Sequence, residues 1–409
     1  MQYEPTHNPA PIVRLPLSKS MSNRVLAMEA VAGRSLHEGA LSDAEDTRVM
    51  EAALASDCPV VDVGDAGTAM RFLTAVLCGR SGHWLLRGSE RMAQRPIGPL
   101  VDALRQMGAT IDYAGAPGFP PLQIDGQALA GGEVDMDGSV SSQFASALLM
   151  VAPACEAGLT LHLTGKIASR PYIDLTLSLM RRCGVAADWV DAQTLRVEAG
   201  TYCPERPLRI EASWTAASYW YECVALRGCG FGGLTLPLLE ADSAQGDRVV
   251  PEIFRQFGVQ TRFTSEGAHI WCAGDCVKAF AYDCSDCPDL VQTLAATCLA
   301  REIPFRLSGL HTLPRKETDR IGALQAVARL FGAQFHREDE GTLTFDGRRS
   351  LQADDTHAQA LLLPTFNDHR MALAFAPLGL DGWNLRFDRP DVVRKSYPHF
   401  WEQLKKTGL

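Results

Sequence analysis

Apolar residues along the chain recur in six similar stretches, and each stretch opens on a few small or polar residues. The stretches begin near residues 18, 65, 138, 213, 285 and 367 and include SKSMSNRVLAMEAVA, DAGTAMRFLTAVL and NDHRMALAFAPLGL. Many are apolar on most faces, as in FASALLMVA, which is typical of helices that are buried inside a domain. The pattern therefore predicts six buried helices whose polar starts lie at helix N-termini.

A second kind of helix follows in several of these repeats. RPIGPLVDALRQMGA, RPYIDLTLSLMRRCGV, GDRVVPEIFRQFGV and KETDRIGALQAVARLFGA each end near a glycine that suits a helix C-terminus. An alternating stretch such as TIDY or AADWV comes next and indicates a strand. Six units of helix, strand, helix and strand divide naturally into three plus three. We expect an α/β protein of two similar lobes joined by a hinge, with residues 1–14 and 213–409 in one lobe and residues 15–212 in the other.

Length and composition agree with two globular domains. At 409 residues the chain exceeds the roughly 250 residues at which single cores stop growing, and 46% of it is hydrophobic. We see no secretory signal at the N-terminus, and the longest apolar run falls short of the roughly 20 residues that a membrane span needs. The expectation is a cytoplasmic protein that does not enter a membrane. A net charge of −9 argues against nucleic-acid binding, so cations for an anionic ligand must be concentrated locally.

Twelve cysteines raise the question of disulfides or metal. Four of them, Cys272, Cys276, Cys284 and Cys287, lie within sixteen residues, and the last two form a Cys-x-x-Cys pair. A zinc knuckle is one interpretation of that spacing. We favour reduced thiols packed as small hydrophobic side chains, with no bound metal.

Cations stand at several of the polar helix starts. Lys19 and Arg24 lie in SKSMSNR, where a positive charge opposes the helix dipole unless an anion is bound there. Solvated surface charges are the alternative interpretation. In an acidic protein, so many cations beside small residues indicate a substrate with two or more anionic groups. The further cations of this kind are Arg71, Arg95, Arg320, Arg370 and Lys395.

Two carboxylates and a hydroxyl cluster complete the candidate chemistry. Asp289 and Glu317 are close in sequence to cations or helix starts, and a carboxylate among cations stays ionised, which suits a proton acceptor facing a hydroxyl. They could equally be acidic residues that favour helix N-termini. Ser141, Ser142 and Gln143 could contact the same ligand or cap a helix. His369 reads as a capping or core histidine, and we assign it no proton transfer.

With these residues assembled, the chain resembles the 5-enolpyruvylshikimate-3-phosphate synthases of the enolpyruvyl transferase family from about Leu15 to Leu404. The motifs SKSMSNR, DAGTAMR, DGSVSSQF, SRPYID, QGD, KETDRI, NDHRMA and KSYPHFWEQL occur in the family order. The resemblance implies two lobes, each of three βαβαββ units with buried helices covered by sheets, an inside-out α/β barrel that closes over its substrates. It implies transfer of the enolpyruvyl group of phosphoenolpyruvate to the 5-hydroxyl of shikimate 3-phosphate by a monomer, without cofactor or metal.

The resemblance also assigns residues to each substrate. It implies a shikimate 3-phosphate site formed by Lys19, Ser20, Arg24, Ser141, Ser142, Gln143, Ser169, Tyr172, Asp289, Thr312 and Lys316. It implies a phosphoenolpyruvate site formed by Lys19, Gly67, Arg95, Gln143, Arg320, Arg370 and Lys395.

The same resemblance implies a two-step reaction. Protonation of C3 of phosphoenolpyruvate makes C2 cationic, the 5-hydroxyl attacks as a base removes its proton, and the tetrahedral intermediate loses phosphate. Asp289 corresponds to the base, and Lys19, Glu317 and Lys395 are the other candidates for proton movement. The arginines would clamp carboxylate and phosphate groups.

Five positions depart from the family pattern: Leu17, Asp65, Phe72, Thr312 and Ser213. Ser213 stands where the family tends to have Asp, so the charge near the hinge is lost although a helix cap remains. Two alternatives to the assigned activity stay open. One is a UDP-N-acetylglucosamine enolpyruvyl transferase, whose loop carries a catalytic cysteine where this chain has Met92 and Ala93. The other is a catalytically silent binding protein on the same scaffold.

Overall fold

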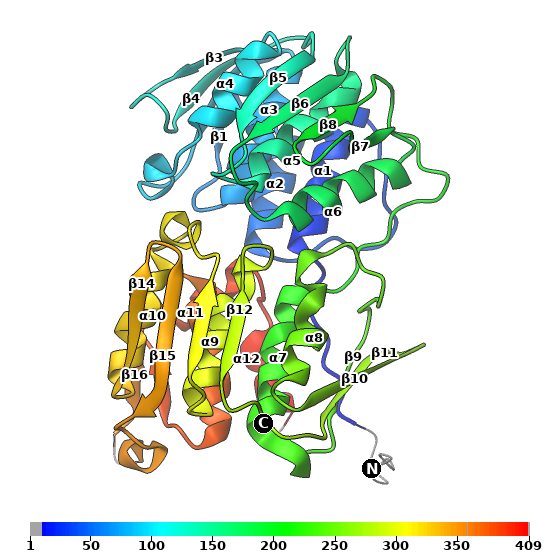
Figure 1. Ribbon diagram of the computed structural model, residues 1–409. Coiled ribbons are helices and arrows are strands. Elements are labelled where there is room, and N and C mark those ends of the chain that lie inside the picture. The colour runs from blue at the N-terminus through cyan, green and yellow to red at the C-terminus, as the bar shows by residue number, and fades with distance from the viewer. Residues whose placement is uncertain (1–9, 358, 408–409) are drawn as a thin grey trace. The chain divides into compact units, whose positions relative to one another are not determined.

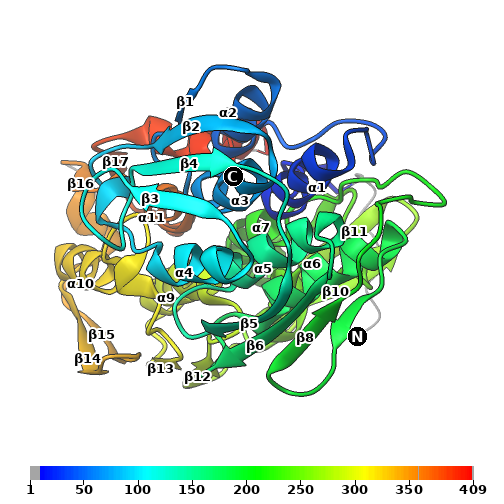
Figure 2. The same ribbon diagram turned by 90° about the horizontal axis from the view of Figure 1, so that it is seen from above.

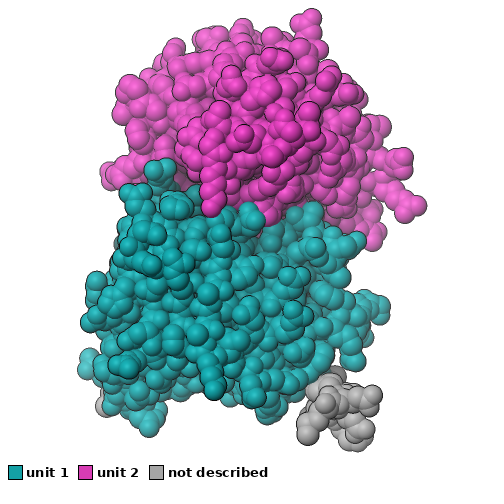
Figure 3. Space-filling view, viewed as in Figure 1, with its two compact units in different colours: residues 1–16, 211–409 teal, residues 17–210 magenta. Residues whose placement is uncertain are grey.

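The computed structural model describes residues 10–357 and 359–407 (Figure 1). Residues 17–210 form one compact unit, and residues 211–409 form the other together with the segment before residue 17. Figure 3 colours the two units separately. Residues 1–9, 358, 408 and 409, which the sequence assigns to the lobe of residues 1–14 and 213–409, lie outside the described residues.

One arrangement of strands and helices occurs three times. In each case two parallel strands are joined by a helix, a second helix follows, and an antiparallel pair completes a four-stranded sheet. The strand orders are β1-β2-β4-β3, β5-β6-β8-β7 and β12-β13-β15-β14, which are the same order in three sheets. The βαβαββ unit implied by the family resemblance is therefore present in three complete copies among the described residues, and Figure 2 shows the sheet of β5, β6 and β8 from another side.

The remaining strands form smaller sheets. In the order β10-β11-β9, Ile12 adds a parallel bridge to Thr235 of β9, so this sheet repeats the same pattern with its first strand taken from the start of the chain. The pair β16-β17 is parallel, and an isolated bridge joins His37 to Leu208. Among the described residues the strands make five separate sheets and no closed barrel.

The unit of residues 17–210 contains six helices and eight strands among its described residues. Its helices are α1 (Lys19–Ala32), α2 (Glu45–Ala55), α3 (Gly67–Gly79), α4 (Gly98–Gln106), α5 (Ser142–Val151) and α6 (Arg170–Arg182). Its strands are β1 (Val60–Asp62), β2 (Gly82–Arg87), β3 (Thr110–Tyr113), β4 (Leu122–Gly126), β5 (Gly132–Asp137), β6 (Leu159–Thr164), β7 (Ala187–Trp189) and β8 (Thr194–Val197).

The other unit contains the third four-stranded sheet and the two smaller sheets. Its helices are α7 (Trp214–Arg227), α8 (Val250–Arg255), α9 (Val291–Ala300), α10 (Arg320–Leu330), α11 (His369–Phe375) and α12 (Phe400–Lys406). Its strands are β9 (Leu234–Leu236), β10 (Val259–Thr264), β11 (Gly267–Cys272), β12 (Phe280–Asp283), β13 (Phe305–Ser308), β14 (Ala333–Asp339), β15 (Thr342–Arg349), β16 (Leu361–Leu363) and β17 (Leu385–Phe387).

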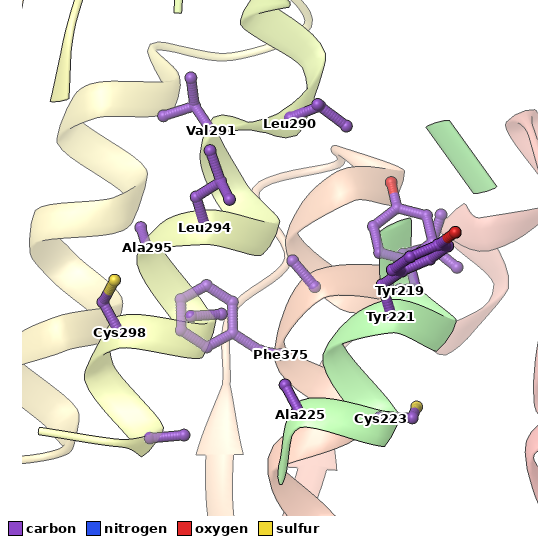
Figure 4. Packing of buried hydrophobic residues seen from close by; sticks show 14 of the residues in the cluster. Tyr219, Tyr221, Cys223, Ala225, Leu290, Val291, Leu294, Ala295, Cys298 and Phe375 are labelled. Carbon is purple, nitrogen blue, oxygen red and sulfur yellow. The ribbon is translucent and has the colours of Figure 1, made fainter. Parts of the chain in front are cut away.

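The apolar helices are internal, as their sequences predict. Every residue of α9 and α11 is buried, and so are all residues of α3 except Gly79. Figure 4 shows the close packing of side chains from α7 and α9 against Phe375. By contrast, α4, α6 and α10 bury one face and leave the residues of the other face partly or fully exposed. The helices of the first kind form the core, and the strands and the second helices cover it.

Helix ends follow the local rules read from the sequence. The side chains of Ser18, Ser141, Ser213 and Asp368 accept hydrogen bonds from the first turns of α1, α5, α7 and α11. At two other starts, α3 and α9, no described side chain caps the helix, and α9 begins only after a 3-10 turn over Pro288–Leu290. The glycines after the second helices all adopt the left-handed conformation expected of C-caps: Gly108, Gly184, Gly258 and Gly332.

Two further properties concern bilayer-spanning helices and groups of potential metal ligands. Among the described residues, no helix combines the length and the apolar character that crossing a bilayer requires. Within that part of the chain, no three His, Cys, Asp or Glu side chains are grouped so that they could hold a metal ion.

Glu222 is an unusual member of the core. Its side chain lies fully buried in α7, no described residue hydrogen-bonds to either carboxylate oxygen, and burial raises its pKa well above the ordinary value. The native protein therefore keeps the proton that the unfolded chain releases above about pH 4.5.

We expect the free energy of unfolding to fall as pH rises, and Glu222→Gln to remove this dependence. Between about pH 5 and the raised pKa, the free energy of unfolding of Glu222→Gln minus that of the wild type should increase by about 1.4 kcal/mol per pH unit. Urea unfolding at several pH values measures it. Glu252→Gln, which removes an exposed glutamate in α8, is the matched control. Parallel pH curves for wild type and Glu222→Gln would contradict the expectation.

Candidate active site

The start of α1 holds Lys19 in an ion pair. Its Nζ lies 2.9 Å from Oδ2 of Asp46, which is nearly completely buried in the first turn of α2. The side chain of Lys19 remains partly exposed, so the ammonium is oriented by Asp46 and still accessible. This contact joins residues 27 positions apart, and the sequence pattern gave Asp46 no role.

Arg24, one turn further along α1, is buried and links several helices. Its Nε donates to Oγ1 of Thr176 at 2.7 Å, and its Nη2 donates to Oγ of Ser146 and to the carbonyl oxygen of Tyr172. Its Nη1 donates to the carbonyl oxygen of Ser20. Burial lowers the pKa of Arg24 to about 10. The structure therefore gives Arg24 a positioning role that connects α1, α5 and α6, and contact with a ligand stays a prediction.

Gly67 and Arg95 meet at the start of α3. A Cβ atom on Gly67 would lie 2.5 Å from Nη1 of Arg95, so any side chain at this position would force the guanidinium to move from its place. Arg95 is mostly buried, and its Nε has no hydrogen-bond acceptor among the described residues. A cation at a helix N-terminus is unfavourable by itself, and a bound anion would stabilise both the cation and the free N–H groups.

The start of α5 is next to the start of α3. Ser141 caps α5, Ser142 begins it, and Nε2 of Gln143 donates to Oγ1 of Thr68 at 3.1 Å. Because Thr68 follows Gly67, Gln143 lies beside the helix start that Arg95 occupies. The structure thus brings together the predicted residues of α3 and α5.

Ser169 and Tyr172 lie at the start of α6. Ser169 has φ 52° and ψ 50°, a left-handed conformation that costs a non-glycine residue on the order of 1–3 kcal/mol. Tyr172 follows in the first turn, and its carbonyl oxygen accepts from Arg24. Hydrogen bonds of Arg24 therefore connect α1 with α6 at Tyr172, and with α5 at Ser146, which is not one of the predicted residues.

In the other unit, Arg320 is the centre of a buried ionic network. Its Nε donates to Asp368 at 2.7 Å, its Nη1 to Asp289 at 3.0 Å and its Nη2 to Glu317 at 2.8 Å. Burial alone would lower the pKa of Arg320, but the three carboxylates raise it above its usual value. The guanidinium therefore remains charged and holds three carboxylates in fixed positions.

Asp289 also forms an ion pair with Arg370. The Nη2 of Arg370 lies 2.6 Å from Oδ2 of Asp289, while its Nη1 lies 3.3 Å from the hydroxyl of Tyr219. Burial would raise the pKa of Asp289, but Arg370, Lys316 and Arg320 outweigh it and lower that pKa well below its usual range. The carboxylate is ionised at neutral pH and can accept a proton.

Glu317 lies between two cations. One of its oxygens accepts from Arg320, and the other lies 3.4 Å from Nζ of Lys395. Lys316 contributes positive charge near Asp289. Thr312 directly precedes the 3-10 turn Leu313–Arg315, and its buried Oγ1 has no hydrogen-bond partner among the described residues. The predicted residues of this unit thus share one network, except Thr312, for which no direct contact with it is shown.

Sequence reasoning missed Asp368 and Tyr219. Asp368 is completely buried, accepts from Arg320 and also caps α11 through the backbone N–H of Arg370. The aspartate inside the motif NDHR, just before an apolar helix, could have indicated Asp368 as a helix cap and as a partner for a cation. Phe366 and Asn367, just before it, both have positive φ, so the chain makes a strained approach to this cap. Tyr219 lies 151 positions before Arg370, and no local pattern indicates their contact.

The departures from the family pattern have local explanations at two positions. Ser213 accepts a hydrogen bond from the backbone N–H of Ala216 and so caps α7, as expected. Phe72 is fully buried, and the guanidinium of Arg24 lies 5.4 Å from its ring centroid.

The cysteines that suggested a zinc knuckle are divided into two groups. The Sγ of Cys272 lies 3.4 Å from that of Cys229, a residue outside the predicted cluster, while Cys284 and Cys287 are buried just before Asp289. Cys276 donates to the carbonyl oxygen of Phe257 and lies close enough to Cys272 to contribute to the raised pKa of that thiol.

Comparison with known proteins shows to which family this chain belongs. A model of the EPSP synthase (3-phosphoshikimate 1-carboxyvinyltransferase) family matches residues 34–404. The chain belongs to this family. A 3-phosphoshikimate 1-carboxyvinyltransferase from Bacteroides fragilis is 44% identical over 97% of this chain and 95% of its own length, and one from Methanoculleus marisnigri is 37% identical over 85% and 79%.

Solved structures share the fold of this EPSP synthase family member. An EPSP synthase from Acinetobacter baumannii matches with a TM-score of 0.70 and 20% identity, over 98% of this chain and 97% of that one. The enolpyruvyl transferase NikO from Streptomyces tendae matches with a TM-score of 0.70 and 14% identity, over 99% and 96%. The two-lobe α/β fold expected from the sequence is confirmed.

Proposed function

We propose that this chain transfers the enolpyruvyl group of phosphoenolpyruvate to the 5-hydroxyl of shikimate 3-phosphate, in the pathway to chorismate and the aromatic amino acids. The products are 5-enolpyruvylshikimate 3-phosphate and phosphate. The observation that carries the proposal is the network of Arg320, Arg370 and Asp289. It combines two fixed guanidinium groups, which suit an anionic donor, with an ionised carboxylate that can act as a base.

Each chemical step has candidate residues. Asp289 would take the proton of the attacking 5-hydroxyl, because its carboxylate stays ionised and is held by two arginines. Glu317 and Lys395 form a pair from which a proton could pass to C3 of phosphoenolpyruvate and back, and Lys19 is a third candidate. Arginines that stabilise the developing negative charge require no reorganisation during the reaction.

Substrate binding would use the helix starts of residues 17–210 as well. The guanidinium of Arg95 over Gly67 and the amide of Gln143 suit the carboxylate or phosphate of phosphoenolpyruvate. The remaining residues proposed for shikimate 3-phosphate are Lys19, Ser20, Arg24, Ser141, Ser142, Ser169, Tyr172, Thr312 and Lys316. We further propose that the enzyme is a cytoplasmic monomer.

The two alternatives are weaker. In the loop where a UDP-N-acetylglucosamine enolpyruvyl transferase carries its cysteine, Met92 is fully buried in this chain and cannot serve as a nucleophile. A silent binding protein would have no need for both Asp289 and Glu317 among fixed cations.

Phosphate release tests the proposal. Purified protein should release phosphate from phosphoenolpyruvate when shikimate 3-phosphate is the acceptor, and should not do so with UDP-N-acetylglucosamine. Folded protein that binds shikimate 3-phosphate without releasing phosphate would support the silent alternative and contradict the proposed activity.

A further inference from the structure

Two thiols from distant parts of the chain meet beside the sheet of β9, β10 and β11. Cys229 lies in the 3-10 turn Gly228–Gly230 that follows α7, and Cys272 is the last residue of β11. Their Sγ atoms are 3.4 Å apart, and both lie 3.9 Å from the carbonyl oxygen of Gly274. The contact joins positions 43 residues apart in sequence.

Accessibility distinguishes this pair from the Cys-x-x-Cys pair before Asp289. Cys284 and Cys287 are 0% and 1% exposed, so a reagent in solution cannot reach either sulfur. Cys229 is exposed, whereas Cys272 behind it is only 8% exposed. One thiol can therefore react with a reagent in solution, and the second is in position to react with the first.

We propose that Cys229 and Cys272 form a modification site at which a low-molecular-weight disulfide, such as oxidised glutathione, introduces a reversible disulfide bond. The thiolate of Cys229 attacks one sulfur of oxidised glutathione and releases one reduced glutathione, which takes up a proton. The thiol of Cys272 then loses its proton to water and attacks Sγ of Cys229, which releases the second glutathione. Two protein thiols are oxidised and one disulfide is reduced to two thiols, so atoms and electrons balance.

The geometry needs little adjustment. A disulfide bond is about 2.05 Å long, so the sulfurs must approach by about 1.4 Å from their present 3.4 Å. Cys229 lies in a short exposed turn, which can make this movement more easily than the paired strand β11. Burial raises the pKa of Cys272 to about 11, which agrees with Cys229 as the thiol that reacts first.

The bond would join the end of α7 to the end of β11. The bond would close a loop of about 43 residues in the unfolded chain. Because the closed loop lowers the conformational entropy of the unfolded state, the bond would stabilise this unit. Tyr219, which contacts Arg370, lies more than two helical turns before Cys229. The proposed catalytic network is therefore not part of the modification site. The proposal is thus independent of the proposed function.

Peptide mapping of the full chain tests the proposal. The reduced protein is incubated with oxidised glutathione, remaining thiols are alkylated, and the digest is analysed by mass spectrometry without reductant. We expect a peptide pair joined through Cys229 and Cys272 that disappears with dithiothreitol, together with a rise in Tm of about 3–8 °C. Cys229→Ser and Cys272→Ser should each abolish the cross-link and the rise.

Two matched variants make the result specific. Cys203→Ser removes an exposed cysteine of the other unit and should leave the cross-link intact, and so should Cys276→Ser. A Cys229 that remains bound to glutathione alone, that pairs with Cys276, or that is recovered alkylated would overturn the proposal.

Discussion

Replacement of Asp289 by asparagine is expected to lower kcat by about 10²–10⁴-fold, because the variant lacks the group that would accept the proton of the attacking hydroxyl. The amide is nearly the same size, so the backbone at the start of α9 should be preserved. The carboxylate of Asp289 now neutralises part of the charge of Arg320 and Arg370. Its removal leaves these arginines more positive, so the KM for phosphoenolpyruvate should stay the same or decrease while kcat falls.

Steady-state kinetics with both substrates separates these effects, and Asp286→Asn is the matched control. Asp286 lies three residues earlier, and its side chain is exposed. It should retain wild-type turnover, which would show that asparagine in this segment does no general harm. Unchanged kcat in Asp289→Asn would remove Asp289 from the mechanism, and a large rise in KM with unchanged kcat would make it a binding residue only.

The fold could be predicted where neighbouring residues determine it. Ser18, Ser141 and Ser213 cap helices because each side chain reaches a backbone N–H two or three residues ahead. The glycines that end the second helices were visible for the same reason, since left-handed backbone at a helix end favours glycine. Burial of entire helices followed from the lack of a polar face.

Contacts between distant segments could not be predicted in this way. Lys19 with Asp46, Gln143 with Thr68, and Cys229 with Cys272 are each made by side chains on separate elements. Their meeting depends on how helices and strands pack, and no periodicity in one segment encodes that. The candidate site was located by its motifs, but the partners of its charges came only from the structure.

The largest loss of stability is expected at Asp368, the carboxylate that the sequence reasoning passed over. Asp368 is completely buried against the guanidinium of Arg320, whose side chain is only 2% exposed. Breaking a buried ion pair typically costs about 3–5 kcal/mol. Here it would leave Arg320 with only Asp289 and Glu317, whose side chains are less deeply buried than Asp368. Asp368→Ala should therefore lower the free energy of unfolding by about that amount, and urea unfolding measures it.

Two further variants separate the ion pair from the helix cap. Asp319→Ala removes the N-cap of α10, beside Arg320 in sequence, and should cost only about 1 kcal/mol because Asp319 bonds to backbone N–H groups. Asp368→Asn keeps an oxygen that can cap α11 but loses the charge, so its cost should be closer to that of Asp368→Ala than to that of Asp319→Ala. If Asp368→Ala cost no more than Asp319→Ala, the carboxylate would be only a cap. The remaining carboxylates, Asp289 and Glu317, would then suffice to hold Arg320 in place.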